Sequence, residues 1–411
     1  MRILRLEAAY SHYWQAIYRE RPGLEQKSYA EQRATFDYDA FMYAGALKED
    51  LKPLGHEVHE IFYNVPLLQK AWAKENGVPW PRGVWTEAVV LAQIRAWKPD
   101  VILWHSGRDF SREFLQQARA AFPAVRLMGV FIGSPFHEID ILKGFDFVLS
   151  CKQEFTERFR NAGLRAYYFQ HVFDQRILPR LPPPPSQLID EVVFSGNVRR
   201  QPGCHFEREQ ILERMADFPD MRIYAPQFDL RPAYDLADTA LRRGTYHFMQ
   251  GLCKLGVPAV TRRRVPIIGK AATWTTPPVS QLNPRLRPFL LPAVYGLKMF
   301  ETLRNARVCL NIQADIAGDE AANIKMFEAT GVGVCLLTDW KPNLGGFFEL
   351  DREVVAYRSA DECVEKARWL LDHPAECNAV GRAGQARALR DHTHTRRSGR
   401  LHELILQEIK R

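Results

Sequence analysis

Short apolar runs alternate with amphipathic stretches along most of this chain. In the first half, strands are predicted at residues 2–9, 56–63, 100–105, 125–132 and 145–151, and helices at 38–54, 84–97 and 110–122. Strand, helix and strand in steady succession are typical of parallel sheets built from βαβ units. The run from Arg176 to Asp190 ends this series, because its consecutive prolines can join neither a helix nor a sheet ladder.

A second series of the same kind follows the prolines. Strands are predicted at 191–197, 221–225, 307–313 and 332–339, and helices at 205–218, 295–306 and 321–331, with three further helices from Ala360 onward. Between Gln227 and about Pro292 the alternation fails, which indicates an insertion. The pattern therefore predicts an α/β protein with two Rossmann-like domains that face a central cleft, in which a ligand binds.

These signals divide the chain into four parts. We predict an N-terminal Rossmann-like domain over 1–178 and a proline-rich linker over 179–190. A C-terminal Rossmann-like domain over 191–393 would carry the insertion at about 228–292. The last segment, 394–411, is predicted to be a helix that returns toward the N-terminal domain.

The composition narrows the class of protein. No run approaches the roughly 18 apolar residues of a membrane-spanning helix, and the first residues lack the apolar region of a secretion signal. The seven cysteines lie far apart without metal-binding spacing, so we interpret them as reduced thiols. We therefore expect a soluble, non-exported, cytoplasmic protein. Its formal net charge of +8 suits a polyanionic partner.

Several common phosphate-binding or nucleophile motifs are absent from the sequence. It contains no GxGxxG, no GxxxxGK[ST] and no GxSxG, which speaks against dinucleotide oxidoreductases, P-loop NTPases and α/β-hydrolases. We expect no cofactor and no resident metal. Asp37 and Asp39 form a D-x-D pair, a pattern that holds a metal in some enzymes, but no suitable strand precedes it, so we interpret it as chance.

One segment carries a recognisable signature. In DEAANIKMFEATGVGVCLLTD, Glu320 and Glu328 stand eight residues apart around a helix start, before a buried strand. This segment resembles the retaining GT-B glycosyltransferases with the E-x7-E signature, in particular the CgeB-like or group 1 branch. The resemblance covers most of the second half of the chain. In the first half it rests on KPDVILWHSG and FQHVFDQRIL.

The resemblance implies an activity and roles for several residues. A sugar would pass from a nucleotide-diphosphate sugar to a growing surface glycan, with retention at the anomeric carbon and without metal. Glu328 would accept hydrogen bonds from the ribose hydroxyls, while Glu320 and His105 would face the transferred sugar as catalytic residues. The other residues implied at the donor are Gly196, Asn197, Arg199, Arg200, Tyr295, Asn323 and Lys325, the three cations serving the pyrophosphate.

Other readings remain open at this stage. His137 is a second candidate histidine beside the donor sugar. The insertion combines basic and aromatic residues, which suits either a peripheral contact with an anionic membrane surface or a solvated lobe over the cleft; nothing indicates nucleic-acid binding. The alternative functions are a GT-B-fold nucleotide-sugar epimerase and a non-catalytic homologue that binds glycan or anionic lipid.

Overall fold

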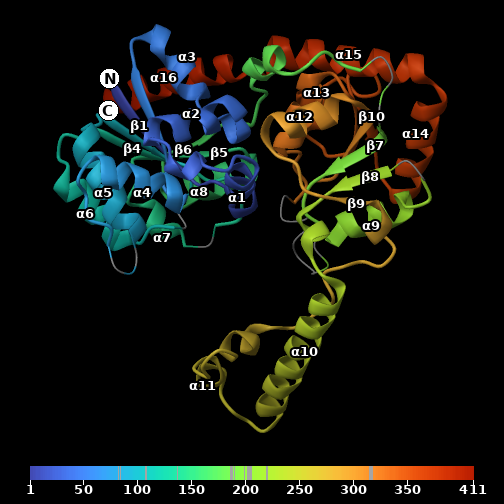
Figure 1. The fold of residues 1–411 in the computed structure, drawn as a ribbon, viewed down its shortest axis with the longest axis horizontal. Helices are drawn as coiled ribbons and strands as arrows, with labels where there is room; N and C mark the ends of the chain where they lie inside the picture. The colour runs from blue at the N-terminus through green and yellow to red at the C-terminus, as the bar shows by residue number, and fades with distance from the viewer. Residues whose placement is uncertain are drawn as a thin grey trace.

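Two sheets form the centres of two lobes that lie side by side (Figure 1). The computed structural model describes residues 1–81, 83, 85–106, 109–136, 138–185, 188, 190–198, 200, 206–218, 221–313 and 318–411. Within this part of the chain each sheet has six strands, and all neighbouring strands run parallel. Parallel neighbours require crossover connections, which helices supply here. The predicted pair of Rossmann-like domains is confirmed.

The first sheet has the strand order β2-β1-β3-β4-β5-β6. Its strands are β1 (Arg2–Glu7), β2 (Glu57–Phe62), β3 (Val101–Trp104), β4 (Leu127–Phe131), β5 (Phe147–Ser150) and β6 (Ala166–Tyr168). The α-helices of this lobe are α1 (Ser11–Glu20), α2 (Tyr29–Asp39), α3 (Ala46–Leu51), α4 (Pro66–Glu75), α5 (Trp85–Trp97), α6 (Arg112–Ala121), α7 (Ile139–Leu142) and α8 (Gln153–Asn161). Its 3-10 helices are η1 (Leu24–Gln26), η2 (Phe41–Tyr43) and η3 (Lys52–Leu54), and η4 (Gln175–Arg180) follows.

Side-chain alternation along these strands fills a core on each face of the first sheet. Leu6 and Trp104 are register partners on one face, where they pack with side chains of α5, α6 and α8. Ile3 and Leu103 point to the opposite face. That face is covered by α3 and by the last helix of the chain, α16 (His394–Ile409).

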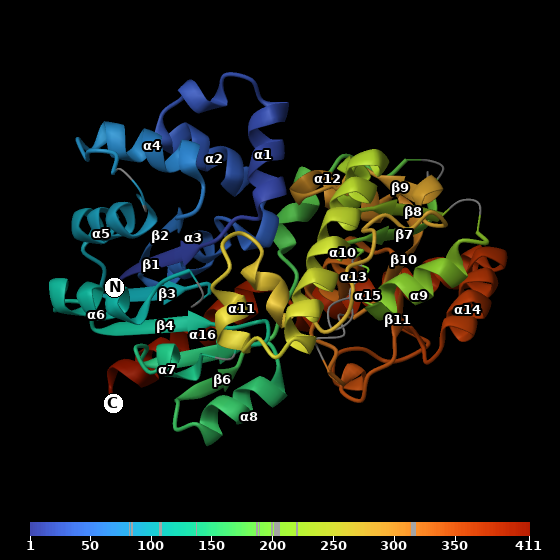
Figure 2. The same ribbon diagram turned by 90° about the horizontal axis from the view of Figure 1, so that it is seen from below.

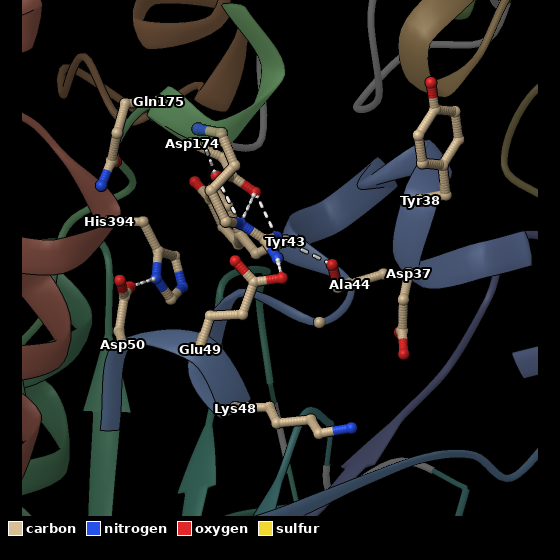
Figure 3. A network of polar contacts seen from close by, with 12 residues as sticks. Asp37, Tyr38, Tyr43, Ala44, Lys48, Glu49, Asp50, Asp174, Gln175 and His394 are labelled. Atoms are coloured by element: carbon tan, nitrogen blue, oxygen red, sulfur yellow. Dashed lines mark hydrogen bonds and ion pairs between the residues drawn. The ribbon is translucent and has the colours of Figure 1, made fainter. Parts of the chain in front are cut away.

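Polar contacts reinforce the return of the chain to the first lobe. Figure 3 shows His394 directed at Asp50, and its Nδ1 lies 2.5 Å from Asp50 Oδ2. In the same network the Arg176 guanidinium donates to the Ala44 carbonyl at 2.9 Å and lies 3.1 Å from Glu49 Oε1. The segment that leaves the first lobe and the helix that comes back to it are therefore held at neighbouring points.

The second sheet has the order β12-β11-β10-β7-β8-β9. Its strands are β7 (Asp190–Ser195), β8 (Met221–Tyr224), β9 (Leu290–Leu291), β10 (Ala306–Asn311), β11 (Cys335–Asp339) and β12 (Val355–Tyr357). The helices of this half are α9 (Phe206–Met215), α10 (Pro232–Lys254), α11 (Ala259–Arg263), α12 (Gly296–Arg304), α13 (Ile324–Val332), α14 (Ala360–Asp372) and α15 (Pro374–Asp391). The 3-10 helices are η5 (Pro226–Asp229), η6 (Gly269–Thr273), η7 (Arg287–Phe289) and η9 (Leu344–Gly346).

The two lobes share one apolar core. Phe36 and Phe41 of the first lobe belong to the same buried cluster as Phe300 and Phe327 of α12 and α13. Phe173, which leaves the first lobe, lies directly against α13: a Cβ added to Gly331 would come within 2.2 Å of its ring. The glycine thus lets a helix of one lobe touch an aromatic ring from the other.

The insertion is helical, which the sequence pattern did not predict. Its main element is α10, a helix of 23 residues that extends away from both lobes, with α11 beside its far part (Figures 1 and 2). We call residues 232–279 the arm. The predicted irregular stretch is wrong here, because the large apolar side chains that α10 repeats along one face are exposed and reach no domain core.

The predicted helix over 38–54 is wrong as one continuous helix, because this span is broken into η2, α3 and η3. Helix α2 ends at Asp39, and the chain then adopts positive φ at Ala40, Met42 and Tyr43, so a right-handed helix cannot continue. Phe41, Ala44, Leu47 and Leu51 of this stretch are nevertheless buried, whereas Leu54 is exposed.

The contact between Gly331 and Phe173 gives a test of the shared core. The substitution Gly331→Ala should lower the free energy of unfolding by about 1–3 kcal/mol, because the methyl group overlaps a fully buried ring. Denaturant unfolding measures the change. Gly399→Ala in α16 is the matched control, since nothing lies within 4 Å of its added Cβ. Equal stability of the two variants would contradict this packing.

Candidate functional site

A cavity of ≈ 720 Å³ opens between the two lobes. Its walls in the second lobe come from the carboxyl ends of β7, β8 and β10 and from the start of α13. Tyr10, His12 and Phe41 of the first lobe form the opposite wall. Ligands of open parallel sheets bind at this edge, because the loops that follow the strands converge there.

Side-chain hydrogen bonds hold the N-terminus of α13 in place. Asn323 is the N-cap residue, and its side-chain oxygen accepts a hydrogen bond from Lys325 N at 2.9 Å. Gln313 Oε1 accepts from the backbone N–H groups of Ala322 and Asn323 at 3.3 and 3.1 Å, which fixes the approach to the helix. The positive end of the α13 dipole therefore faces the cavity.

Glu328 and Lys325 form an ion pair on the cavity wall. Lys325 Nζ lies 2.7 Å from Glu328 Oε2, one helical turn away, and both side chains are largely buried. Lys325 Nζ also lies 2.9 Å from Met299 Sδ. The ammonium group thus compensates the carboxylate within the site.

The loop after β7 forms a second wall. Gly196 and Asn197 line the cavity, and the Gln227 side chain donates to Asn197 Oδ1. Gln227 Oε1 in turn accepts from Val198 N at 3.3 Å. Five predicted donor-binding residues are thus present with Glu328 in one cavity: Gly196, Asn197, Tyr295, Asn323 and Lys325.

The cavity is also lined by a buried arginine, Arg208, which was not predicted from the sequence. Arg208, on the first turns of α9, donates to the carbonyls of Ile312 at 3.0 Å and Asn197 at 3.3 Å. These contacts place its guanidinium between the ends of β7 and β10. The only signal in the sequence is its place on the helix after the glycine loop, and that position does not reveal which side chain turns inward.

The two predicted neighbouring arginines have different outcomes. Arg200 lies away from the cavity lining, with its Nε 2.5 Å from Glu209 Oε1 and its Nη1 near the Ser280 and Leu282 carbonyls. Arg199 lies outside the described residues, as does the second candidate histidine, His137. The contact of Arg200 with the pyrophosphate stays a prediction. Arg208 lines the cavity, and Arg200 does not.

Glu320 binds the opposite lobe. Its carboxylate accepts hydrogen bonds from Gln153 N and Glu154 N, both at 2.7 Å. These N–H groups belong to the first turn of α8, whose own N-cap residue, Lys152, makes no side-chain capping bond. Glu320 therefore caps a helix of the first lobe, and it does not line the 720 Å³ cavity. Its role toward the sugar stays a prediction.

His105 lies in a different, smaller cavity of ≈ 50 Å³. Its ring stacks on Phe131, and its Nδ1 lies 3.3 Å from Glu7 Oε2. Burial lowers the pKa of His105, and the charge of Glu7 opposes that shift. The structure thus brings His105 close to Glu7 rather than to Glu328. His12, which the sequence reading missed, is the histidine that lines the large cavity.

The D-x-D aspartates have structural partners. Asp37 accepts from Arg33 at 2.6 Å, and Asp39 Oδ1 accepts from Leu297 N at the start of α12 at 3.2 Å. Among the described residues, no group of three or more His, Cys, Asp or Glu side chains is arranged to hold a metal ion. Within the same residues, none of the helices combines the length and apolar character needed to cross a membrane.

Comparison with known proteins places these features in context. Residues 251–403 match a family model described as glycosyl transferase-like. No curated protein matches the chain in a sequence search. The matched segment includes α12, α13 and the Glu320–Glu328 pair.

Solved structures match over the whole chain. A glycosyltransferase from Rickettsia africae has a TM-score of 0.54 at 8% identity, with 100% of this chain and 98% of that chain covered. HepE from Anabaena, solved with UDP and glucose, has a TM-score of 0.54 at 12% identity, with 99% and 100% covered. The chain has the GT-B fold. A Listeria monocytogenes protein described as a UDP-N-acetylglucosamine 2-epimerase shares it, with a TM-score of 0.50 at 12% identity and coverage of 100% and 96%.

The contact of Glu320 with α8 gives a second test. Glu320→Ala should lower the free energy of unfolding by about 1–2 kcal/mol, because two backbone N–H groups lose a charged acceptor. Asp319→Ala, at the exposed neighbouring residue, is the control and should change little. Denaturant unfolding of both variants checks this. Equal effects would mean that Glu320 does not cap α8 in solution.

Proposed function

We propose that the chain transfers a sugar from a nucleotide-diphosphate sugar to an acceptor glycan, in the synthesis of a cell-surface polysaccharide. The observation that carries this proposal is the buried Glu328–Lys325 pair on α13, inside a cavity of ≈ 720 Å³ at the carboxyl ends of parallel strands. A cavity of this size suits a nucleotide sugar. The glycosyl transferase-like match over residues 251–403 supports it.

The donor would bind across the start of α13. Glu328 would accept hydrogen bonds from both ribose hydroxyls, since its two oxygens suit a diol. The pyrophosphate would lie at the N-terminus of α13 beside Lys325 and Arg208, where the helix dipole and two cations favour negative charge. Lys325 would then exchange part of its contact with Glu328 for a phosphate oxygen.

The reaction would break the bond between the anomeric carbon and the phosphate oxygen and form a bond from that carbon to an acceptor hydroxyl oxygen. The hydroxyl proton would pass to the leaving phosphate, and attack on the same face would give retention. We propose that no metal takes part, because Lys325 and Arg208, which line the cavity, would stabilise the negative charge on the leaving phosphate.

The proposed catalytic roles of Glu320 and His105 require both residues to rearrange. Glu320 would have to leave the N-terminus of α8 to face the sugar, and His105 would have to become accessible from the large cavity. His12 already lines that cavity and could receive the acceptor proton if the reaction inverted the anomeric centre. The stereochemistry of the product distinguishes these roles.

The acceptor and the location of the enzyme belong to the same proposal. A glycan or lipid-linked acceptor would enter from the first lobe, past Tyr10 and His12. We propose a cytoplasmic protein, and peripheral contact of the insertion with an anionic membrane surface stays a prediction.

A nucleotide-sugar epimerase is the second candidate. The similarity in fold to the Listeria monocytogenes protein favours it. An epimerase would convert the nucleotide sugar in the absence of any acceptor, whereas a transferase requires one for sugar transfer.

Nucleotide binding tests the proposed donor site. In a thermal-shift panel of UDP, GDP, ADP, CMP and TDP with EDTA, one diphosphate should stabilise the protein by about 2.7 kcal/mol at 100 times its dissociation constant. Glu328→Ala and Glu328→Gln should each abolish the shift, because neither keeps a carboxylate for the ribose. Stabilisation only without EDTA would contradict metal independence.

Glu365→Ala is the matched control, since this exposed glutamate of α14 belongs to the same lobe. It should keep the full nucleotide shift. Each shift is measured against the same variant without nucleotide, so a change in basal stability does not enter. No shift with any nucleotide, or a full shift in both Glu328 variants, would overturn the donor site.

A further inference from the structure

The arm exposes apolar side chains to an unusual degree. Among the described residues, seven of the fifteen exposed large apolar side chains lie in the arm, between residues 234 and 267. Four of them follow one another at intervals of seven on and just after α10: Tyr234, Leu241, Phe248 and Leu255 are 68%, 72%, 54% and 81% exposed. Residues seven apart on a helix share a face, so these four form one stripe.

Small residues alternate with the large ones along this stripe. Ala237, Gly244 and Gly251 stand three residues after Tyr234, Leu241 and Phe248, which completes a heptad pattern. We call these seven residues the seam. Nothing lies within 4 Å of a Cβ added to Gly244 or Gly251, and neither residue has a positive φ. The fold of one chain therefore requires neither glycine, although each destabilises a helix.

The opposite face of α10 makes contacts within the same chain. Asp235 is buried and accepts hydrogen bonds from Ser280, Gln281 and Leu282, where the arm returns to the second lobe. Met249 is fully buried, and Arg262 donates to its carbonyl at 3.3 Å. The arm is thus held internally on one side, and the seam on the other side is left for a separate partner.

We propose that the seam is a dimer interface, in which α10 pairs antiparallel with α10 of a second copy of this chain. This inference goes beyond the proposed function and does not depend on it. When Leu241 is opposite Gly244 of the second copy, Tyr234 is opposite Gly251 and Phe248 is opposite Ala237. Each of these three large side chains then meets a small residue, as close packing requires, and Leu255 lies beyond the last of these pairs.

A parallel pair would be poorly matched. Equal positions would face each other, so Tyr234, Leu241 and Phe248 would each meet their own copy, and glycine would meet glycine. The glycine layers would leave voids between the layers of paired large side chains, and voids in an interface reduce its stability.

The charges of the arm favour the same orientation. Seven cations lie in its outer part, Arg242, Arg243, Lys254, Arg262, Arg263, Arg264 and Lys270, and residues 239–279 contain no Asp or Glu. At the base of α10 stand Asp229 and Arg231, and Asp238 pairs with Arg242 of the same helix, with its Oδ2 2.7 Å from Arg242 Nε. An antiparallel pair keeps the two basic tips apart, whereas a parallel pair would bring them together.

Sedimentation velocity of the full chain at micromolar concentrations tests the proposal. The wild type should sediment as a dimer, and the double variant Leu241→Glu, Phe248→Glu should dimerise at least about tenfold more weakly, because both changes bury charge in the seam. Leu236→Glu is the control, since this exposed leucine lies on α10 outside the seam. It should leave the dimer intact.

Gly244→Leu separates the interface from the helix itself. Leucine is the better helix former, so the melting temperature of the diluted, monomeric chain should rise or stay the same. The dimer should be lost, because the added side chain prevents close approach of the second helix. Loss of both folding and dimerisation would mean that Gly244 serves the arm of a single chain, and the proposal would fail.

Crosslinking reports the orientation. In a Cys204→Ser, Cys253→Ser background, which removes the exposed thiol among the described cysteines and the cysteine outside the described residues, a mixture of Ala240→Cys and His247→Cys chains should be joined 240 to 247 by a short bismaleimide. Crosslinks of 240 to 240 would indicate a parallel pair. A monomeric wild type overturns the proposal. If such a monomer instead binds anionic phospholipid vesicles through Leu241 and Phe248, the seam is a membrane contact.

Discussion

Two carboxylates hold the lobes together by capping helices across the cleft in opposite directions. Asp39 of the first lobe accepts from Leu297 N at the start of α12, and Glu320 of the second lobe accepts from two N–H groups at the start of α8. Each exchanges an unsatisfied helix terminus for a charged hydrogen bond between lobes. Because the same lobes also share an apolar core, the carboxyl ends of the two sheets face each other, and the cavity with Glu328 lies between them.

Most of the sheet framework could be predicted from the sequence, since parallel strands buried on both faces leave continuous apolar runs. The short strands β6, β9 and β12 and the helices α1, α2, α4, α7 and α8 were missed. Helix 38–54 was wrong because positive φ at Ala40 and Tyr43 comes from tertiary packing, which periodicity does not record. Helix α10 was not predicted, because its apolar residues form an exposed seam around Gly244 and Gly251 instead of facing a domain core.

The candidate site was predictable where the residues lie close together in the sequence. Asn323, Lys325 and Glu328 belong to one helix start, and they line one cavity in the structure. Arg208 and His12 were missed because their inward direction depends on contacts between distant segments. For Glu320, closeness in the sequence did not predict closeness in space. It lies eight residues before Glu328, yet its partners belong to the other lobe.

The central claim of this account is that the start of α13 binds a nucleotide diphosphate. A crystal structure with the diphosphate that stabilises the protein tests it most directly. The account predicts the ribose hydroxyls within hydrogen-bonding distance of the Glu328 carboxylate and the pyrophosphate at the N-terminus of α13, with Lys325 turned toward it. A nucleotide bound elsewhere, with the Lys325–Glu328 pair unchanged at 2.7 Å, would contradict it.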